Sequence, residues 1–418
     1  METHYEEELE PITKAELSQK QEKAHTRNIV GLFSFLFGGN IGIVTVAHDC
    51  AKMFELQEET IATQETMGLM DTLAKWRPAV QACDGSADGQ YFTVATLDGC
   101  IHEIHMINDI EHGGLYFDIL ETVHCAIAPS KLMFATVSFT GFISEIEVGQ
   151  TTFKRREPFA NAKNVSCLKY SPDQKYLAIG MNDGVIELFD AEELKPYHKY
   201  EVHSMKIKRI EFLPGGEHFL SACDDKLIKM HSLMNLKEIE GHRSVKAVRV
   251  FSAHNAPVTA LAVDEKSGGT RFASGSASGQ IFIWHIEMTT PIDAVMNDHV
   301  GPISCLSFSP HGRHLFSGGD DMMLCVFKVP PTGEATPRND QAYYDQQQQQ
   351  YVVEGESYSN SGDPRMDQEN HYQYQEQEES YQEYQPERSI DENEYNPEVV
   401  GQPQQQYDDE EEYNPIVD

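Results

Sequence analysis

Three short sets of residues in this chain place a histidine, a serine and an acidic or polar residue in the same order. The sets are His203, Ser221 and Asp225; His254, Ser274 and Ser278; and His299, Ser317 and Asp321. A serine nucleophile, a histidine base and an acidic residue that orients the base make a hydrolytic triad, so hydrolysis has to be considered. Catalysis needs one site, whereas repetition of one pattern is expected of structural hydrogen bonds between buried polar groups. The structural interpretation is therefore favoured.

The sets belong to a repeat that runs through most of the chain. The segments NVSCLKYSPDQKYLAIGMNDGVIELFD (164–190) and PISCLSFSPHGRHLFSGGDDMMLCVFK (302–328) both predict a strand, a Pro/Gly/Asp turn, a second strand, an acidic turn and a third strand. The third strands end on aromatic or equivalent residues at 54, 104, 146, 189, 231, 284 and 327. Most of these positions are 42 or 43 residues apart, which indicates seven units with two insertions.

This period resembles that of WD repeats, in which each unit builds one four-stranded blade. The resemblance implies an all-β fold, a seven-bladed WD-repeat β-propeller. In WD repeats the histidine, serine and acidic residues form a buried hydrogen-bond chain that ends on the third strand, often on a tryptophan. His231, Trp284 and Phe327 occupy that position here. The resemblance therefore implies structural roles for all three sets, with no catalytic residue, cofactor or metal.

The stretch IVGLFSFLFGGNIGIVTVA at 29–47 has no charged residue and is long enough for a membrane-spanning helix. Alignment of the acidic turns instead makes this stretch the first two strands of blade one, folded back at GGN. The same alignment places Phe35 on Tyr170 and Phe308. Inner strands of a propeller are covered on both faces, so a continuous apolar run is expected and no membrane span is needed.

The ring also needs a closing strand, because the seventh unit ends near Val329, one strand short. The segment AELSQKQEKAH (15–25) can supply it, and an open sheet edge would otherwise invite aggregation. We therefore expect a propeller over 15–330, preceded by an acidic disordered N-terminus (1–14).

Composition changes sharply after residue 330. Residues 331–418 contain 23 acidic and three basic residues, eleven of the 18 tyrosines and a QQQQQ run. Few aliphatic residues and high charge cannot offset the entropy of ordering, so a disordered acidic tail rich in Tyr and Gln is predicted. The net charge of −35 argues against direct binding to nucleic acid or to an anionic membrane.

Cysteine usage indicates a reducing compartment. None of the eight cysteines forms a C-x-x-C pair, and their scatter suggests neither a zinc site nor a disulfide framework. The acidic start METHYEEELE lacks the basic residues of a secretory signal. We expect a protein of the cytoplasm and nucleus.

Three strings, QKQEKAHTRNIVGL, YSPDQKYLAIGMNDGVIELFD and FLSACDDKLIKM, resemble the WD-propeller subunits of superkiller complexes. In animals this family also accompanies RNA-polymerase-associated factors. The resemblance implies a non-catalytic adaptor, monomeric within a hetero-complex, that holds a helical-repeat scaffold beside an RNA helicase feeding the exosome. A generic adaptor, such as a ubiquitin-ligase substrate receptor, is the alternative, and a propeller hydrolase is a more remote one. Direct RNA binding is disfavoured by charge.

The partner site is expected on the face that carries the turns between second and third strands, where functional residues lie on loops held by a rigid frame. Lysines there would attract an acidic partner segment, and an aromatic residue could anchor it. The predicted site comprises Phe139, Asn164, Asn182, Lys206, Lys208 and Lys226.

Overall fold

The computed structural model describes residues 14–330, except positions 38, 59–64, 76–79, 87–90, 98–99, 106–110, 118–121, 131, 139, 149, 151, 235–245 and 296–297. The described residues form seven four-stranded antiparallel sheets, which confirms the all-β, seven-bladed propeller. The tail predicted at 331–418 and nearly all of the predicted N-terminal segment lie outside the described residues.

The first four blades follow one another along the chain. Blade one contains β2 (Ile29–Phe37), β3 (Asn40–Ala47), β4 (Cys50–Glu58) and β5 (Glu65–Lys75). Blade two contains β6 (Val80–Gly85), β7 (Tyr91–Thr96), β8 (Cys100–His105) and β9 (Glu111–Phe117). Blade three contains β10 (Thr122–Ile127), β11 (Met133–Ser138), β12 (Phe142–Glu147) and β13 (Phe153–Pro158). Blade four contains β14 (Val165–Tyr170), β15 (Tyr176–Met181), β16 (Val185–Asp190) and β17 (Lys195–Glu201).

The last three blades include the one that joins the two ends of the propeller. Blade five contains β18 (Ile207–Phe212), β19 (His218–Cys223), β20 (Ile228–Ser232) and β21 (Arg249–Phe251). Blade six contains β22 (Val258–Val263), β23 (Arg271–Ser276), β24 (Ile281–His285) and β25 (Asp293–Val295). Blade seven contains β26 (Ile303–Phe308), β27 (His314–Gly319), β28 (Leu324–Lys328) and β1 (Glu16–Gln21). Short 3-10 helices lie at Ala162–Asn164 and Glu265–Ser267.

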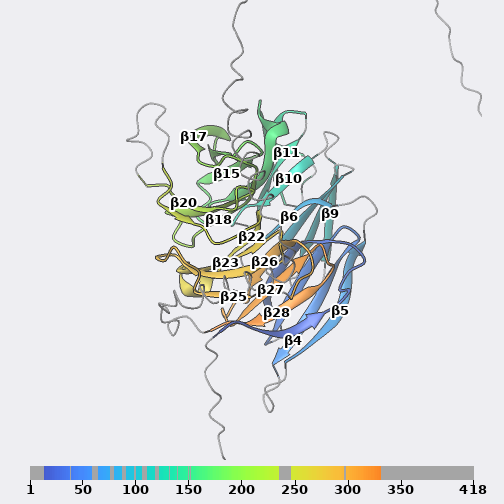
Figure 1. Ribbon diagram of the computed structural model, residues 1–418. Helices are drawn as coiled ribbons and strands as arrows, with labels where there is room; N and C mark the ends of the chain where they lie inside the picture. The colour runs from blue at the N-terminus through green and yellow to red at the C-terminus, as the bar shows by residue number, and fades with distance from the viewer. Residues whose placement is uncertain are drawn as a thin grey trace, which may run out of the picture. The chain divides into compact units, whose positions relative to one another are not determined.

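The blades close into a ring. Each inner strand, from β2 through β6, β10, β14, β18 and β22 to β26, contacts the next, and β26 contacts β2. In Figure 1 the orange strands of blade seven accordingly lie beside the blue strands of blade one. The outer strand of blade seven is β1, which pairs antiparallel with β28 and places Leu17 opposite Phe327. The predicted closing strand at 15–25 is thus confirmed.

The core lies between neighbouring blades, because each sheet buries both faces. Phe35 and Val44 of blade one pack in one cluster with Phe92 and Val94 of blade two. Similar clusters join the other blades, and one of them contains both Phe251 of blade five and Trp284 of blade six. Burial of both faces accounts for the continuous apolar runs along the inner strands.

The apolar stretch at 29–47 is β2 and β3, as predicted. A side chain at Gly42 would meet the ring of Phe35, since a Cβ there would lie 2.6 Å from the Phe35 Cζ. The glycines of this stretch therefore allow close packing of the hairpin. None of the helical segments in the described residues has the length and hydropathy of a membrane-spanning helix.

The predicted alignment of Phe35 with Tyr170 and Phe308 is wrong by one residue. Ser34 pairs with Ile43 in blade one, as Tyr170 pairs with Leu177 in blade four. The β2–β3 hairpin stays paired up to Phe37 and Asn40, whereas the ladder in blade four stops earlier and a wider turn follows. Because the hairpin of blade one is longer, the residue equivalent to Tyr170 is Ser34 and not Phe35.

Candidate protein-interaction face

The histidine and serine of blade five lie in a continuous hydrogen-bond chain. The imidazole of His203 contacts Asp225 through Nδ1 at 2.7 Å and the hydroxyl of Ser221 through Nε2 at 2.8 Å. Ser221 in turn lies 2.8 Å from Nε2 of His231 on the third strand. The Ser221 side chain is buried. A hydroxyl enclosed in this way cannot reach a substrate.

Blades six and seven contain shorter versions of the chain. In blade six, Ser274 contacts His254 Nε2 at 2.6 Å and accepts a hydrogen bond from the indole of Trp284 at 2.8 Å. Ser278, at the acidic position, bonds Asn255 at 3.4 Å and leaves His254 Nδ1 without a partner among the described residues.

In blade seven, His299 contacts Asp321 at 2.8 Å and Ser317 at 2.5 Å. Phe327 offers no hydrogen-bond donor, so this chain stops at the serine.

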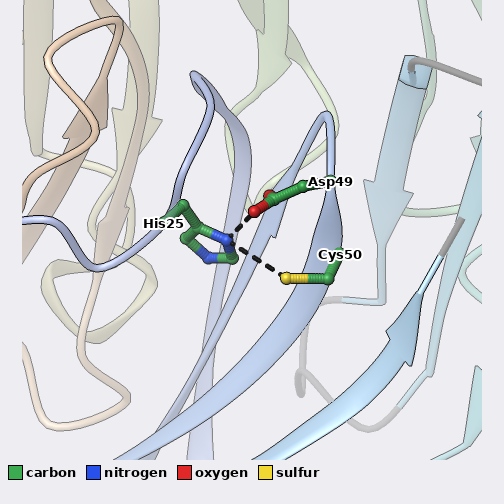
Figure 2. Close-up of side chains that lie close together, drawn as sticks. All are labelled: His25, Asp49 and Cys50. Carbon is green, nitrogen blue, oxygen red and sulfur yellow. Dashed lines mark hydrogen bonds and ion pairs between the residues drawn. The ribbon is translucent and has the colours of Figure 1, made fainter. Parts of the chain in front are cut away.

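A fourth set, in blade one, escaped the sequence analysis. His25 contacts Thr45 through Nε2 at 2.7 Å and Asp49 through Nδ1 at 3.2 Å (Figure 2). Threonine replaces serine here, and the longer hairpin adds two residues to the spacing found in blades five and seven. His25 also precedes the first strand of its blade. A pattern search that allowed threonine and a variable hairpin length would have found it.

Burial favours the neutral form of two of these histidines, His254 and His25. It lowers the pKa of His254 to about 3, and it lowers that of His25 to about 4 although Asp49 favours the charged form. Burial disfavours the charge of Asp225, but the hydrogen bond and charge interaction with His203, together with hydrogen bonds from Leu227 and Cys223, outweigh this and lower the carboxyl pKa to about 2. A histidine that resists protonation this strongly is a poor general base at neutral pH.

A cavity of about 740 Å³ opens on the face that carries the turns between second and third strands. Its lining includes three residues of the predicted partner site, Asn182, Lys206 and Lys208. The charged lining residues are five basic and four acidic: Lys163, Lys169, Lys206, Lys208, Arg209, Asp84, Glu211, Asp224 and Asp320. The chain as a whole has a net charge of −35, whereas the charged residues that line this cavity have no excess of negative charge.

Arg209 reaches this cavity because of a local irregularity in β18. The register shifts between Ile207 and Arg209, and an extra residue in a strand re-aims the side chains beside it. Each inner strand of the seven described blades has such a shift near its start. Strict alternation predicted Lys206 and Lys208 on one side of the strand but did not predict Arg209.

Charged side chains from different blades meet at the wall of this cavity, where the inner strands surround the axis of the ring. The ammonium of Lys169 contacts Asp84 at 2.9 Å and Glu211 at 3.5 Å. Burial disfavours the ammonium charge, but these carboxylates outweigh it and raise the pKa of Lys169. Arg209 donates to the carbonyl oxygens of Val30 and Ser304, both at 3.2 Å. A second cavity, of about 710 Å³, lies where the inner strands end, and it shares these charged residues.

The remaining predicted partner residues are placed differently. Lys226 is exposed in the turn beyond β19, with a φ of 69°, and Asn164 donates to Asp183 at 2.8 Å. Neither lines the 740 Å³ cavity. Phe139 lies outside the described residues. Two apolar side chains that sequence analysis did not single out, Met205 and Val300, are 50% and 86% exposed at the loops that lead into inner strands.

Known protein families match parts of this architecture. Residues 147–215 match the family model of the anaphase-promoting complex subunit 4 WD40 domain. Residues 245–285 and 292–328 match that of the WD domain, G-beta repeat. These matches cover the fourth, sixth and seventh blades best.

Similar curated proteins share the repeat over part of their length. The chain is 25% identical over 169 residues to WD repeat and FYVE domain-containing protein 2 of Homo sapiens, covering 39% of each. It is 25% identical over 166 residues to THO complex subunit 3 of Arabidopsis thaliana, covering 39% of this chain and 47% of that protein. It is 29% identical over 141 residues to DDB1- and CUL4-associated factor 13 of Dictyostelium discoideum, covering 34% and 30%. The chain thus spans less than half the length of each relative.

Seven four-stranded blades, a closing strand from the N-terminal side and repeated His–Ser contacts define a WD-repeat β-propeller. This chain is a seven-bladed protein of that class, and proteins of the class generally bind other proteins.

Proposed function

We propose that this protein is a non-enzymatic scaffold that binds partner proteins through the face containing the 740 Å³ cavity. The observation that carries the proposal is the burial of every candidate nucleophile. Ser221, Ser274 and Ser317 are each 0% exposed and hydrogen-bonded to a neighbouring histidine. Hydrolysis would need one accessible serine, whereas a scaffold needs only the rigid frame that these bonds support.

The complex that we propose is of the superkiller type, acting in RNA decay, together with a nuclear role beside transcription-elongation factors. Its support is the resemblance of the three sequence strings, which lie in β1–β2, blade four and blade five. The proposed partners are a helical-repeat scaffold and an RNA helicase, or polymerase-associated factors, in the cytoplasm and nucleus. The relative named as a THO complex subunit shows that similar repeats occur in a subunit of a complex.

A substrate-receptor role in a ubiquitin ligase is the second candidate. Its support is the relative named as a DDB1- and CUL4-associated factor, which is 29% identical over 141 residues. Affinity purification of the full chain from cells, followed by mass spectrometry, separates the two. Superkiller or polymerase-factor subunits among the strongest interactors support the first candidate, and cullin-ligase subunits support the second.

The proposed face attracts an acidic partner segment. Lys206 and Lys208 border the cavity, and Met205 beside them offers an exposed apolar contact. Complementary charge speeds docking, while a central apolar side chain contributes more of the affinity. Lys208 also lies 3.5 Å from Asp224, so reversing its charge adds repulsion within the face.

The test is a pull-down with the double variant Lys206→Glu/Lys208→Glu and with Met205→Ala. The matched control is Lys195→Glu/Lys199→Glu, which changes the charge equally on the outer strand β17. We expect the first double variant to lose the main partner and the control to keep it. If both double variants, checked for folding, bind like the wild type, this face is not the partner site. Phe139→Ala tests the predicted aromatic anchor in the same assay.

A further inference from the structure

Three metal-ligating side chains meet in blade one, at the point where the chain leaves the closing strand β1. His25 precedes β2, Asp49 lies in the turn after β3, and Cys50 begins β4. Figure 2 shows the imidazole facing both the carboxylate and the thiol. The His25 Nδ1 atom lies 3.2 Å from Asp49 Oδ1 and 3.5 Å from Cys50 Sγ. The three donor atoms all lie within 4.8 Å of one another.

The two distances from His25 Nδ1 are close to those between ligands on one tetrahedral ion. With Zn–N and Zn–O bonds of about 2.1 Å and a Zn–S bond of about 2.3 Å, neighbouring ligand atoms lie about 3.4 to 3.6 Å apart. The observed N–O and N–S distances are close to this range. One Nδ1 hydrogen can serve only one strong acceptor, whereas one metal ion can bind the imidazole, the carboxylate and the thiolate at the same time.

The surrounding contacts orient two of the ligands. The other ring nitrogen of His25 lies 2.7 Å from Thr45 Oγ1, which is the outer contact that a metal-bound histidine makes. The second carboxylate oxygen of Asp49 accepts hydrogen bonds from the Thr26 amide at 3.2 Å and the Thr26 hydroxyl at 2.6 Å. Asp49 Oδ1 therefore remains directed toward His25 and Cys50.

Blades five and seven show what distinguishes blade one. There the Nδ1–carboxylate distances are 2.7 and 2.8 Å, shorter than the 3.2 Å of His25 and Asp49. The strand register aligns Cys50 with Leu227 and Met323, which carry no thiolate. Cys100 of blade two stands at the same register position, so the contact of Cys50 with His25 is what marks the group in blade one.

A second group of the same three residue types, His203, Cys223 and Asp225 in blade five, also brings its donor atoms within 4.8 Å of one another, but its hydrogen bonds differ. The thiol of Cys223 donates to the carbonyl oxygen of Met205 at 3.1 Å and accepts from the Asp225 amide at 3.3 Å. Its sulfur is thus engaged by the backbone, and His203 keeps a short hydrogen bond to Asp225. Cys223 is therefore a matched control for Cys50.

We propose that His25, Asp49 and Cys50 form a binding site for a thiophilic divalent cation such as Zn²⁺. His25 binds through Nδ1 and carries its proton on Nε2, facing Thr45. Cys50 binds as the thiolate, so one proton leaves its sulfur for solvent as the Zn–S bond forms. The carboxylate and thiolate together balance the charge of the ion. Asp49, whose side chain is 20% exposed, gives access from solvent, and water completes the coordination.

The bound ion would join the segment that follows β1 to the third strand of blade one. His25 is four residues beyond the end of β1, so the ion acts next to the ring closure. Metal binding to the folded state alone raises its stability. The sequence did not suggest this site, because His25 and Cys50 are 25 residues apart and no C-x-x-C or H-x-x-H spacing marks them.

The test uses the full chain, stripped with a chelator and then titrated with Zn²⁺ by calorimetry and with Co²⁺ by absorption spectroscopy. The variants are Cys50→Ala, Asp49→Asn and the control Cys223→Ala. We expect the wild type and Cys223→Ala to show a thiolate-to-cobalt charge-transfer band and a thermal midpoint that rises with Zn²⁺. Cys50→Ala should lose the band and bind Zn²⁺ at least tenfold more weakly, and Asp49→Asn should bind it more weakly.

The stripped proteins provide the check on folding, because each variant must show a cooperative transition in chelator before metal is added. If Cys50→Ala does not, Cys50→Ser replaces it. Absence of a charge-transfer band in the wild type overturns the proposal, as does a band that survives in the folded Cys50 variant. Loss of the band in Cys223→Ala alone would overturn it too, by moving the site to blade five. None of these readings depends on partner binding, so they are independent of the proposed scaffold function.

Discussion

The ammonium of Lys169 in blade four lies 2.9 Å from the carboxylate of Asp84 in blade two, so this ion pair joins two blades that are not neighbours in the ring. Arg209 of blade five extends the pattern by donating to carbonyl oxygens of blades one and seven. Two side chains thus connect five of the seven described blades. Such contacts restrain the relative positions of inner strands that are not neighbours in the ring.

Replacement of Lys169 should therefore destabilise the propeller. In Lys169→Met, Asp84 and Glu211 lose their shared cation and repel each other. We expect a loss of about 1–3 kcal/mol, below the cost for a fully buried pair because Lys169 is 26% exposed and screened by solvent. Urea denaturation measures it. Lys175→Met, which removes a pair on an exposed turn, is the control and should leave the midpoint unchanged; equal effects would contradict a special role for Lys169.

The buried hydroxyls of Thr45 in blade one and Ser221 in blade five should both stabilise the folded protein through their hydrogen bonds to histidine. Ser221→Ala removes the contacts to His203 and His231, and Thr45→Ala removes the contact to His25. Each leaves a buried imidazole nitrogen unsatisfied, at a cost of about 1–3 kcal/mol. Chemical denaturation should show these losses, with the exposed Ser204→Ala as the neutral control. A variant with wild-type stability would show that its hydroxyl is structurally dispensable.

Residues that repeat with the blade period could be predicted from the sequence, whereas contacts between distant blades could not. The apolar run at 29–47 became a hairpin once its acidic turn was aligned with the other blades, and segment 15–25 was needed to complete the last sheet. The set around His25 was missed because threonine and a longer hairpin disguise it. Lys169 and Asp84 are 85 residues apart, and no local pattern reports that a ring brings them together.

Acidification should weaken the fold before the blade carboxylates titrate. Burial holds the pKa of His254 at about 3, below the value of about 6.5 in an unfolded chain. The unfolded state therefore takes up the proton first, so stability is complete above about pH 6.5 and falls as the pH drops toward 3. By pH 5 the loss is about 2 kcal/mol for this histidine. Asp225, with a pKa of about 2, contributes stability that is lost only below about pH 4.

Urea denaturation at pH 7 and pH 5 measures the effect, with His254→Gln as the comparison. Glutamine cannot take up a proton, so this variant should lose about 2 kcal/mol less than the wild type over the interval. An identical pH dependence in the two proteins would mean that His254 does not titrate differently on unfolding.

Removal of residues 335–418 should leave the propeller unchanged. The deletion begins after Pro330, whose carbonyl oxygen accepts a hydrogen bond from Arg271, so this contact is retained. Arg271 also keeps its ion pair with Asp264, at 2.7 Å. The removed residues include no apolar position of the repeat. Differential scanning calorimetry should give the same thermal midpoint with and without them. A decrease of about 5 °C or more would show that the tail packs on the fold.

Removal of the closing strand should have the opposite result. In the deletion of 1–21, β28 loses β1 and becomes an edge strand with free backbone groups. Its residues Leu324 to Phe327 are fully buried in the intact protein, so the deletion also exposes apolar surface. We expect a fall in thermal midpoint of about 5–10 °C, corresponding to about 2–3 kcal/mol for a chain of this size, and self-association through the new edge.

The deletion of 1–13 is the matched control, because it removes the acidic start and retains β1 (Glu16–Gln21). It should keep the wild-type midpoint and remain monomeric in analytical ultracentrifugation. A synthetic peptide of residues 14–25 should restore the longer deletion, since an added strand can pair with the open edge of β28. The same peptide with Leu17→Lys should restore it less, because Leu17 lies opposite Phe327. If the longer deletion melts like the wild type and stays monomeric, β1 is not needed to close the ring.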